Sequence, residues 1–166
     1  MKKFLVISLI SVLLVNCKKF DKVEDPGTQQ CTYDPCAVKA PATEIQSVQD
    51  YLTANNITAT QHCSGLFYKI ERPGTGVAPS ACSSVTIRYI GKFTNGTIFD
   101  QTQGTSTYTN NLSYLIRGWI NGVPFISSGG KIHLYIPSTL GYGSQANGPI
   151  PANSILIFEI ELVSVQ

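Results

Sequence analysis

The sequence predicts an α+β domain in which a curved antiparallel β-sheet wraps around a single short α-helix. From about residue 65 onward, apolar and polar side chains alternate at every second position in three segments, 85–93, 131–136 and 155–163. This period of two is typical of strands with one buried face. Asn95-Gly96 follows the first segment and is a strong signal for a tight hairpin between antiparallel strands.

A short apolar segment between these strands supplies the expected helix. Residues 115–123 contain Trp119, with Gly118 and Gly122 around it. Glycine destabilises a helix interior by roughly 1 kcal/mol relative to alanine, so these two residues limit the length of the helix. Strands that pack around one such helix predict an α+β domain of about 100 residues, which we place at residues 65–166.

A helical extension is expected before this domain, over residues 43–64. Thr43 and Gln46 fit a capping box, in which the two side chains satisfy backbone N–H groups at the start of a helix. Three apolar side chains follow at helical spacing and give the helix one apolar face. They are Ile45, Val48 and Leu52. We expect the helix to span residues 43–54 and to pack on the following domain.

The first residues predict a signal peptide and not a part of the fold. Lys2 and Lys3 form a basic start, and residues 4–15 form an apolar run of 12 residues. Such a run is too short to cross a bilayer as a helix, but it suits the core of a signal peptide. We therefore assign residues 1–16 to a signal peptide.

Cys17 follows the signal peptide and resembles the acylated cysteine of a bacterial lipobox, although Asn16 departs from the small residue usual before it. The resemblance implies that Cys17 becomes the lipidated N-terminus of the mature protein. Several acyl chains together anchor a protein firmly to a membrane. The alternative is an ordinary signal peptide with an incidental cysteine.

Residues 17–42 are expected to form a tether, because charged residues and prolines are frequent there and large apolar side chains are few. Four cysteines remain after Cys17, namely Cys31, Cys36, Cys63 and Cys82. They allow three pairings, and an exported chain is expected to form two disulfides. We favour a local Cys31–Cys36 loop with a Cys63–Cys82 bridge.

Composition and motifs exclude several classes of function. The net charge is +2 and no basic patch is evident, so we expect no nucleic-acid partner. The chain lacks G-x-S-x-G and H-E-x-x-H, and Gly74-Thr75-Gly76 opens no helix. His62 and His133 are distant from each other, and no C-x-x-C occurs. We therefore predict no metal site and no cofactor.

Aromatic side chains at strand ends and in loops are the remaining candidates for a site. They are Tyr89, Phe99, Tyr108, Trp119, Tyr142 and Phe158. Aromatic residues belong to a plain core more often than to a pocket. Tyr142, however, stands between two glycines, where a core tyrosine would be unusual.

Five motifs around these aromatics resemble the FKBP family of prolyl isomerases, over roughly residues 65–166. They are residues 85–91, the Asn95-Gly96 turn leading to Phe99-Asp100, residues 115–119, Gly141-Tyr142-Gly143, and residues 150–158. Each motif is weak alone, but their order and spacing together make a specific signal. Residues 101–107 contain no basic side chain to partner Asp100, as family members commonly have.

The resemblance implies a proline pocket at the junction of the sheet and the short helix. Trp119 corresponds to its floor, and Tyr89, Phe99 and Phe158 correspond to its walls. Tyr108, in a loop, takes a position where the family often has phenylalanine. The strand pattern independently places Tyr89 and Phe158 on apolar faces.

The resemblance also implies the polar contacts and the rim. Tyr142 is expected to donate its hydroxyl to a substrate carbonyl, and Asp100 to be the polar group within the pocket. Leu115 and Ile116 are expected to line the mouth, with the Ile116 backbone N–H offered to the substrate, and Ile150 to close the rim.

The family resemblance predicts a peptidyl-prolyl cis-trans isomerase that helps exported proteins to fold. The implied partners are proline-containing unfolded or exported polypeptides, macrolide inhibitors, and a bacterial membrane reached through the lipid anchor, on its periplasmic or outer side. One alternative is a proline-binding or chaperone module with the same fold and little turnover. Another is a structural or adhesive surface lipoprotein.

Overall fold

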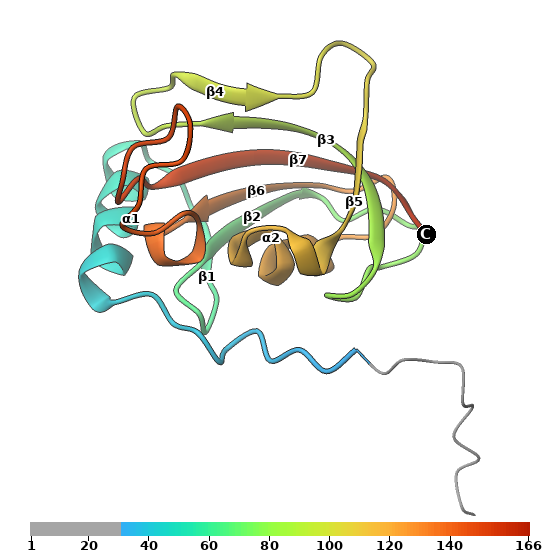
Figure 1. Cartoon of the computed structure of the whole chain (residues 1–166), viewed down its shortest axis with the longest axis horizontal. Helices are drawn as coiled ribbons and strands as arrows, with labels where there is room; N and C mark the ends of the chain where they lie inside the picture. Colours follow the sequence, from blue (N-terminus) through green and yellow to red (C-terminus); the bar gives the residue numbers. More distant parts are fainter. Residues whose placement is uncertain (1–30) are drawn as a thin grey trace, which may run out of the picture. The chain divides into compact units, whose positions relative to one another are not determined.

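A computed structural model describes residues 31–166, so the expected signal peptide, Cys17 and the first part of the tether lie outside the described residues (Figure 1). The α-helices are α1 (Ala42–Ala54) and α2 (Arg117–Gly122), and the short 3-10 helices are η1 (Leu112–Tyr114), η2 (Val123–Phe125) and η3 (Ser138–Leu140). The strands are β1 (Thr60–Gln61), β2 (Phe67–Arg72), β3 (Ser84–Lys92), β4 (Ile98–Gln101), β5 (Tyr108–Asn111), β6 (Lys131–Ile136) and β7 (Leu156–Val165). Within residues 31–166, no helix has the length and hydropathy that a membrane crossing requires.

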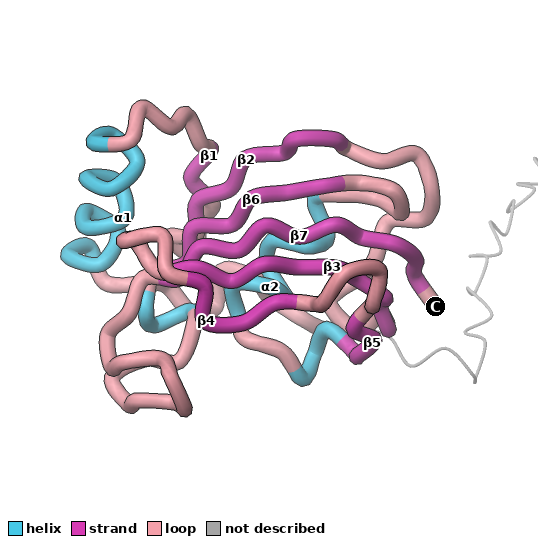
Figure 2. The backbone as a smooth tube through the Cα atoms, turned by 90° about the horizontal axis from the view of Figure 1, so that it is seen from above, coloured by secondary structure: helices cyan, strands magenta, loops and turns pink. Residues whose placement is uncertain are grey.

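The strands form one antiparallel sheet, as the sequence predicted. Their order is β1-β2-β6-β7-β3-β4, and both β4 and β5 pair along one edge of β3 (Figure 2). The Asn95-Gly96 hairpin joins β3 to β4, and Gly96 has the positive φ of 85° that such a turn favours. Tyr108 was expected in a loop, and this prediction was wrong, because Tyr108 begins β5 and pairs with Ile87.

The face of the sheet that α2 covers, here called the inner face, holds the main core (Figure 1). Alternate residues of the three central strands point into it, which confirms the predicted alternation. Tyr89 is half-buried, and the other inward-pointing residues are at most 3% exposed. They are Val85, Ile87, Ile132, Leu134, Ile136, Leu156, Phe158, Ile160 and Leu162.

Two glycines allow α2 to lie close to the sheet. A Cβ atom on Gly118 would stand 2.5 Å from the Ile136 Cδ1 atom, and one on Gly122 would stand 2.5 Å from a methyl carbon of Leu134. Glycine is the residue type that permits so close a backbone approach. The close approach brings Trp119, next to Gly118, against the inner face.

Helix α1 packs against the opposite face, here called the outer face, at one end of the strands (Figure 2). Val48 and Leu52 are buried there against Phe67 and Tyr135. Tyr135 follows the inward-pointing Leu134, so its side chain belongs to the outer face. The predicted apolar face of this helix is therefore confirmed.

The capping box predicted for this helix was wrong. The helix begins at Ala42, with Pro41 at the N-cap and no capping side chain. Thr43 therefore lies inside the first turn, and the Gln46 amide donates to the Asp50 carboxylate at 2.8 Å. Glu44, instead, reaches out of the helix to Thr139.

Beyond α1, the outer face carries charged side chains in two clusters. A β-bulge between Ile70 and Arg72 brings both Glu71 and Arg72 to this face. One cluster joins Glu161 to Arg72 and Arg88 at 3.2 and 3.4 Å, and the other joins Glu71, Glu159, Lys131 and His133. His133 thus lies on the polar face of β6.

Two disulfides attach the segment before α1 to the sheet domain, and they differ from the pairing we favoured. The bonds are Cys31–Cys82 and Cys36–Cys63. The expected Cys31–Cys36 and Cys63–Cys82 bridges are therefore wrong.

The path of residues 31–41 explains the pairing. The Ala40 backbone N–H donates to the Ser64 carbonyl at 2.8 Å, which brings the chain before α1 alongside the Cys63 region. The Tyr33 hydroxyl donates to the Asn121 side-chain oxygen at 2.6 Å. The segment thus lies along the domain, and neither cysteine in it turns back on the other.

Candidate active site

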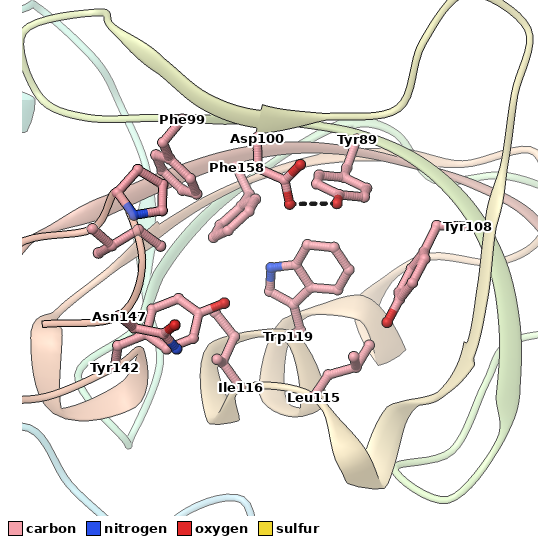
Figure 3. Close-up of a pocket in the computed structure, with 12 residues that line it drawn as sticks. Tyr89, Phe99, Asp100, Tyr108, Leu115, Ile116, Trp119, Tyr142, Asn147 and Phe158 are labelled. Atoms are coloured by element: carbon pink, nitrogen blue, oxygen red, sulfur yellow. Dashed lines mark hydrogen bonds between the residues drawn. The ribbon is translucent and has the colours of Figure 1, made fainter.

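A single pocket brings together all ten substrate-site residues that the sequence singled out (Figure 3). It lies between the inner face, α2 and the loops after η1 and η3, and its volume is about 410 Å³, a size typical of small-ligand sites. The lining residues are Tyr89, Phe99, Asp100, Tyr108, Leu115, Ile116, Trp119, Tyr142, Asn147, Pro149, Ile150 and Phe158.

The register of three adjacent strands brings the pocket walls together around Gly91. In the sheet, Gly91 of β3 stands opposite Asp100 of β4 on one side and Phe158 of β7 on the other. A Cβ atom on Gly91 would lie 2.7 Å from the Phe99 ring and 2.8 Å from the Phe158 ring. The missing side chain therefore leaves the space in which these two rings meet.

The wall and floor rings contact one another edge to face. Trp119 and Phe158 have ring centroids 5.0 Å apart with an interplanar angle of 89°, and Tyr89 and Trp119 have centroids 5.1 Å apart at 74°. Phe99 and Phe158 are 5.5 Å apart at 90°. Each such pair contributes about 0.5–1.5 kcal/mol beyond burial, so the rings hold one another in place.

Trp119 forms the floor and is 5% exposed. Its indole Nε1 is the one buried side-chain nitrogen or oxygen in residues 31–166 that lacks a hydrogen-bond partner. An unpartnered buried donor costs about 1–3 kcal/mol, and folded cores usually avoid it. Stability alone therefore does not account for a tryptophan at this position.

Tyr89 supplies the partner for Asp100 that residues 101–107 lack. The Tyr89 hydroxyl donates to the Asp100 carboxylate at 2.6 Å (Figure 3). Burial raises the pKa of Tyr89 above its ordinary value, and the hydrogen bond to Asp100 raises that pKa further. The tyrosine therefore stays protonated and holds the carboxylate at the edge of the pocket.

Tyr142 follows η3 and points its hydroxyl into the pocket from the side opposite the sheet (Figure 3). The residue is 37% exposed, so a ligand can reach it. Burial raises the pKa of Tyr142, and the nearby negative charge of Asp100 adds to this effect. The hydroxyl is therefore a neutral donor at physiological pH.

The mouth of the pocket is formed by Leu115, Ile116 and Ile150. Ile116 is the N-cap of α2, with an extended backbone (φ −62°, ψ 148°), so its N–H lies outside the hydrogen-bond ladder of the helix. Ile150 is held by reciprocal backbone hydrogen bonds with Asn147 at 2.9 and 3.0 Å.

Asn147 and Pro149 also line the pocket, although the sequence did not predict them as site residues. Both belong to an exposed turn. The dipeptides Asn147-Gly148 and Gly148-Pro149 were a signal for a turn, but not for its position at a binding site. Asn147 consequently adds a polar side chain to the pocket lining, and Pro149 adds an apolar one.

Comparison with known proteins agrees with this geometry. The family model described as FKBP-type peptidyl-prolyl cis-trans isomerase matches residues 76–163, just over half of the chain and the whole pocket lining. The chain belongs to the FKBP-type peptidyl-prolyl cis-trans isomerase family. The predicted FKBP fold, a curved antiparallel sheet on a short helix, is thereby confirmed.

Individual relatives cover the domain and part of the region before it. The FKBP-type isomerase FkpA of Aeromonas hydrophila is 37% identical over 123 residues, which are 71% of this chain and 45% of the relative. The outer membrane protein MIP of Legionella longbeachae is 38% identical over 62% of this chain and 45% of its own length. The crystal structure of FkpA from Escherichia coli superposes with a TM-score of 0.68 at 31% identity, over 75% of this chain and 60% of that one. The chain thus spans less than half of the length of these two curated relatives.

Within residues 31–166, two groups of metal-ligand side chains lie outside the FKBP pocket. Cys36 and Cys63 stand beside His62, but their sulfurs are joined in a disulfide and are not available as thiolates. Glu71, Glu159 and His133 meet on the outer face, where the Lys131 ammonium lies 3.2 and 3.3 Å from the two carboxylates. The lysine already occupies the space between the carboxylates and neutralises part of the negative charge that a cation would need.

Proposed function

We propose that this FKBP family member catalyses the cis-trans isomerisation of X-Pro peptide bonds. The observation that carries the proposal is the pocket itself, in which interlocked rings over Trp119 meet the hydroxyl of Tyr142 and the carboxylate of Asp100. A space walled by aromatic rings, with polar groups beside them, suits a proline ring and the peptide on either side of it.

The physical chemistry of the reaction requires no nucleophile. Rotation about a peptide bond faces a barrier of ~18–20 kcal/mol, because resonance is lost in the twisted geometry. The twisted amide has a less polar carbonyl, and a dry aromatic pocket favours this state more than water does. Catalysis then consists of tighter binding of the twisted form than of the planar forms.

Polar groups at the mouth hold the chain on both sides of the rotating bond. In the proposed complex, Tyr142 donates its hydroxyl to one substrate carbonyl, and Ile116 offers its backbone N–H to another acceptor. Asp100, fixed by Tyr89 at 2.6 Å, faces the amide and does not exchange protons with it. Uncatalysed X-Pro bonds need tens to hundreds of seconds, so the acceleration matters for folding.

Protease-coupled isomerisation of a proline peptide tests the proposal, with the purified oxidised chain freed of its signal segment. We expect Tyr142→Phe and Asp100→Ala to lower kcat/KM about three- to tenfold, the effect of losing one hydrogen bond. The matched control is Tyr114→Phe, because Tyr114 is 81% exposed and lies outside the pocket lining. Its kcat/KM should equal that of the parent protein.

A folded, oxidised protein that gives no acceleration would contradict the isomerase proposal. Quenching of Trp119 fluorescence by the same peptide would then favour a proline-binding or chaperone module. The proposal also includes macrolides as competitors for the pocket, and they should inhibit turnover and quench Trp119 together.

We further propose that the protein is exported, anchored through Cys17, and active on proline-containing polypeptides outside the cytoplasm. The two disulfides support an oxidising compartment. The basic start and apolar run before Cys17 support export, and one relative is named an outer membrane protein.

Incorporation of a labelled fatty acid in a bacterial host tests the anchor. The parent chain should be labelled and membrane-associated, and Cys17→Ser should lose the label. The variant Cys36→Ser/Cys63→Ser is the matched control and should keep it. A label that persists in Cys17→Ser would contradict lipidation at this residue.

A further inference from the structure

The loop that carries Tyr142 is short and is held at both ends by backbone hydrogen bonds. The N–H groups of Gly141 and Gly143 both donate to the Ser138 carbonyl, at 2.9 and 2.8 Å. The Gly143 carbonyl accepts from the Asn153 N–H at 2.9 Å. The position of Tyr142 in the pocket therefore depends on the position of η3, which begins at Ser138.

A side chain from α1 holds η3. One carboxylate oxygen of Glu44 accepts the backbone N–H of Thr139 at 2.8 Å, and the other accepts the Thr139 hydroxyl at 2.8 Å. Hydrogen bonds to a charged acceptor are stronger than neutral ones, and two on one residue fix its orientation. The contact joins residues 95 positions apart in the sequence, and only two residues separate Thr139 from Tyr142.

The carboxylate itself is held in place, because α1 is fixed on the sheet. Val48, on the turn after Glu44, is fully buried against the outer face, and Ile45 packs against both core clusters. Leu140, next to Thr139, is also fully buried. Glu44 thus connects α1, which is anchored on the sheet, to η3, which precedes the Tyr142 loop.

We propose that Glu44 is a positioning residue for the isomerase reaction, acting through Thr139 and η3 to hold the Tyr142 hydroxyl over the pocket. This inference rests on the proposed isomerase function, and it assigns a role to the helical extension in front of the FKBP domain. Glu44 does not line the pocket, so its effect reaches the substrate only through the loop.

Three variants and one control test the proposal by steady-state kinetics. Glu44→Ala removes both acceptors and should raise KM, lowering kcat/KM about three- to tenfold with kcat changed less than twofold. Thr139→Val removes only the hydroxyl and should have an intermediate effect. Glu44→Gln keeps an oxygen for the Thr139 N–H and an amide for its hydroxyl, so it should retain at least half of kcat/KM. Asp50→Ala is the matched control, since this exposed acid of the same helix contacts Gln46.

A double variant separates positioning from general destabilisation. In a Tyr142→Phe background, where the hydroxyl is absent, Glu44→Ala should change kcat/KM less than twofold. A full three- to tenfold loss in both backgrounds would overturn the proposal, because Glu44 would then act elsewhere. An unchanged KM in Glu44→Ala would overturn it as well.

Hydrogen exchange of the Thr139 and Gly143 amides gives a readout that does not depend on turnover. Exchange at both should rise at least about tenfold in Glu44→Ala and stay unchanged in Asp50→Ala. Unchanged exchange in Glu44→Ala would overturn the positioning role, whatever the activity. If exchange rises in Glu44→Ala but the parent protein shows no isomerase activity, the proposed function is overturned instead. The contact between Glu44 and Thr139 would then have only a structural role.

Discussion

The inner and outer faces of the sheet are made by the same strands but are stabilised in different ways. On β7, Phe158 points inward and is 3% exposed, whereas the side chain of Glu161 points outward and is 36% exposed. Inward side chains form an apolar core that continues into the aromatic pocket. Outward side chains pack under α1 at one end of the strands and form ion pairs along the rest.

This difference indicates where substitutions will be costly. Burial of a large apolar side chain contributes about 1.5–3 kcal/mol, and its removal also leaves a cavity. An ion pair exposed to water contributes about 0–1 kcal/mol. The pocket therefore belongs to the face where substitutions destabilise the protein most, and the charged clusters can be substituted with little effect on folding.

Phe158→Ala should have the largest effect. The ring contacts Trp119, Phe99 and Tyr89, so we expect a loss of about 3–5 kcal/mol in the free energy of unfolding. Urea denaturation measures it. Phe158→Leu is the control for the pocket, since it keeps most of the buried volume but loses the ring contacts. Its kcat/KM should fall by a larger fraction than its free energy of unfolding. A loss below 1 kcal/mol in Phe158→Ala would contradict the contrast between the faces.

Leu52→Ala tests whether the apolar end of the outer face behaves like the inner core. Leu52 is 5% exposed beneath α1, so we expect a loss of about 2–5 kcal/mol. Isomerase activity of the folded protein should fall less than twofold, because Val48 still seats the part of α1 that carries Glu44. Equal fractional losses in the free energy of unfolding and in kcat/KM would show that this end of the helix also supports the pocket.

Glu161→Gln should destabilise the protein by no more than about 1 kcal/mol, although its carboxylate contacts both Arg72 and Arg88. High salt should shrink the difference further, because exposed charges are screened. Urea denaturation at low and high salt gives both values. A loss above 2 kcal/mol would show that the outer clusters contribute as much as a buried side chain.

The smallest effects should appear in the pH dependence, which should differ between the charged clusters of the outer face and the pocket of the inner face. Hydrogen bonds from His133 and Lys131 lower the pKa of Glu71 below its ordinary value. Its stabilising contribution is therefore present above the unfolded pKa of about 4.5 and is lost as pH falls through the lower, folded value. The Tm between about pH 3 and 6 should consequently fall less in Glu71→Gln than in the parent protein.

Isomerase activity, in contrast, should not change with pH from neutral into the mildly alkaline range. Burial raises the pKa values of both Tyr89 and Tyr142, so both hydroxyls remain protonated into the alkaline range. We expect kcat/KM to stay constant from pH 7 to about pH 9.5, below the ordinary tyrosine pKa of about 10. A decline centred near pH 8 would indicate that another group controls the pocket.

The sequence was sufficient to predict the central strands and most of the pocket. Alternation along β3, β6 and β7 is strong because one face of each strand is buried. Strand β5 escaped notice because Thr109, Asn110 and Asn111 show no alternation. The predicted capping box was wrong because Pro41 occupies the N-cap position. Glu44, in the first turn, makes a long-range contact with Thr139 that no local pattern predicts.

The pocket followed from motifs, and its details depend on distant contacts. The family motifs identified Trp119 and Tyr142, yet Asn147 lies in a turn whose composition is that of any exposed loop. The disulfide pairing could not be deduced from spacing, because it depends on how residues 31–41 lie along the domain. The hydrogen bond from Tyr89 to Asp100 likewise joins two strands at a register that only the folded sheet fixes.

The bond between Cys31 and Cys82 also sets the radius of action of an anchored isomerase. If Cys17 is held at a membrane, only the 14 residue steps to Cys31 can span the gap, about 50 Å when fully extended. Reduction of the Cys31–Cys82 bond would move the first contact with the domain only to Tyr33, whose hydroxyl donates to Asn121, and the reach would grow by two residue steps, about 7 Å. If the protein is anchored at Cys17, its pocket therefore reaches only polypeptides close to the membrane surface.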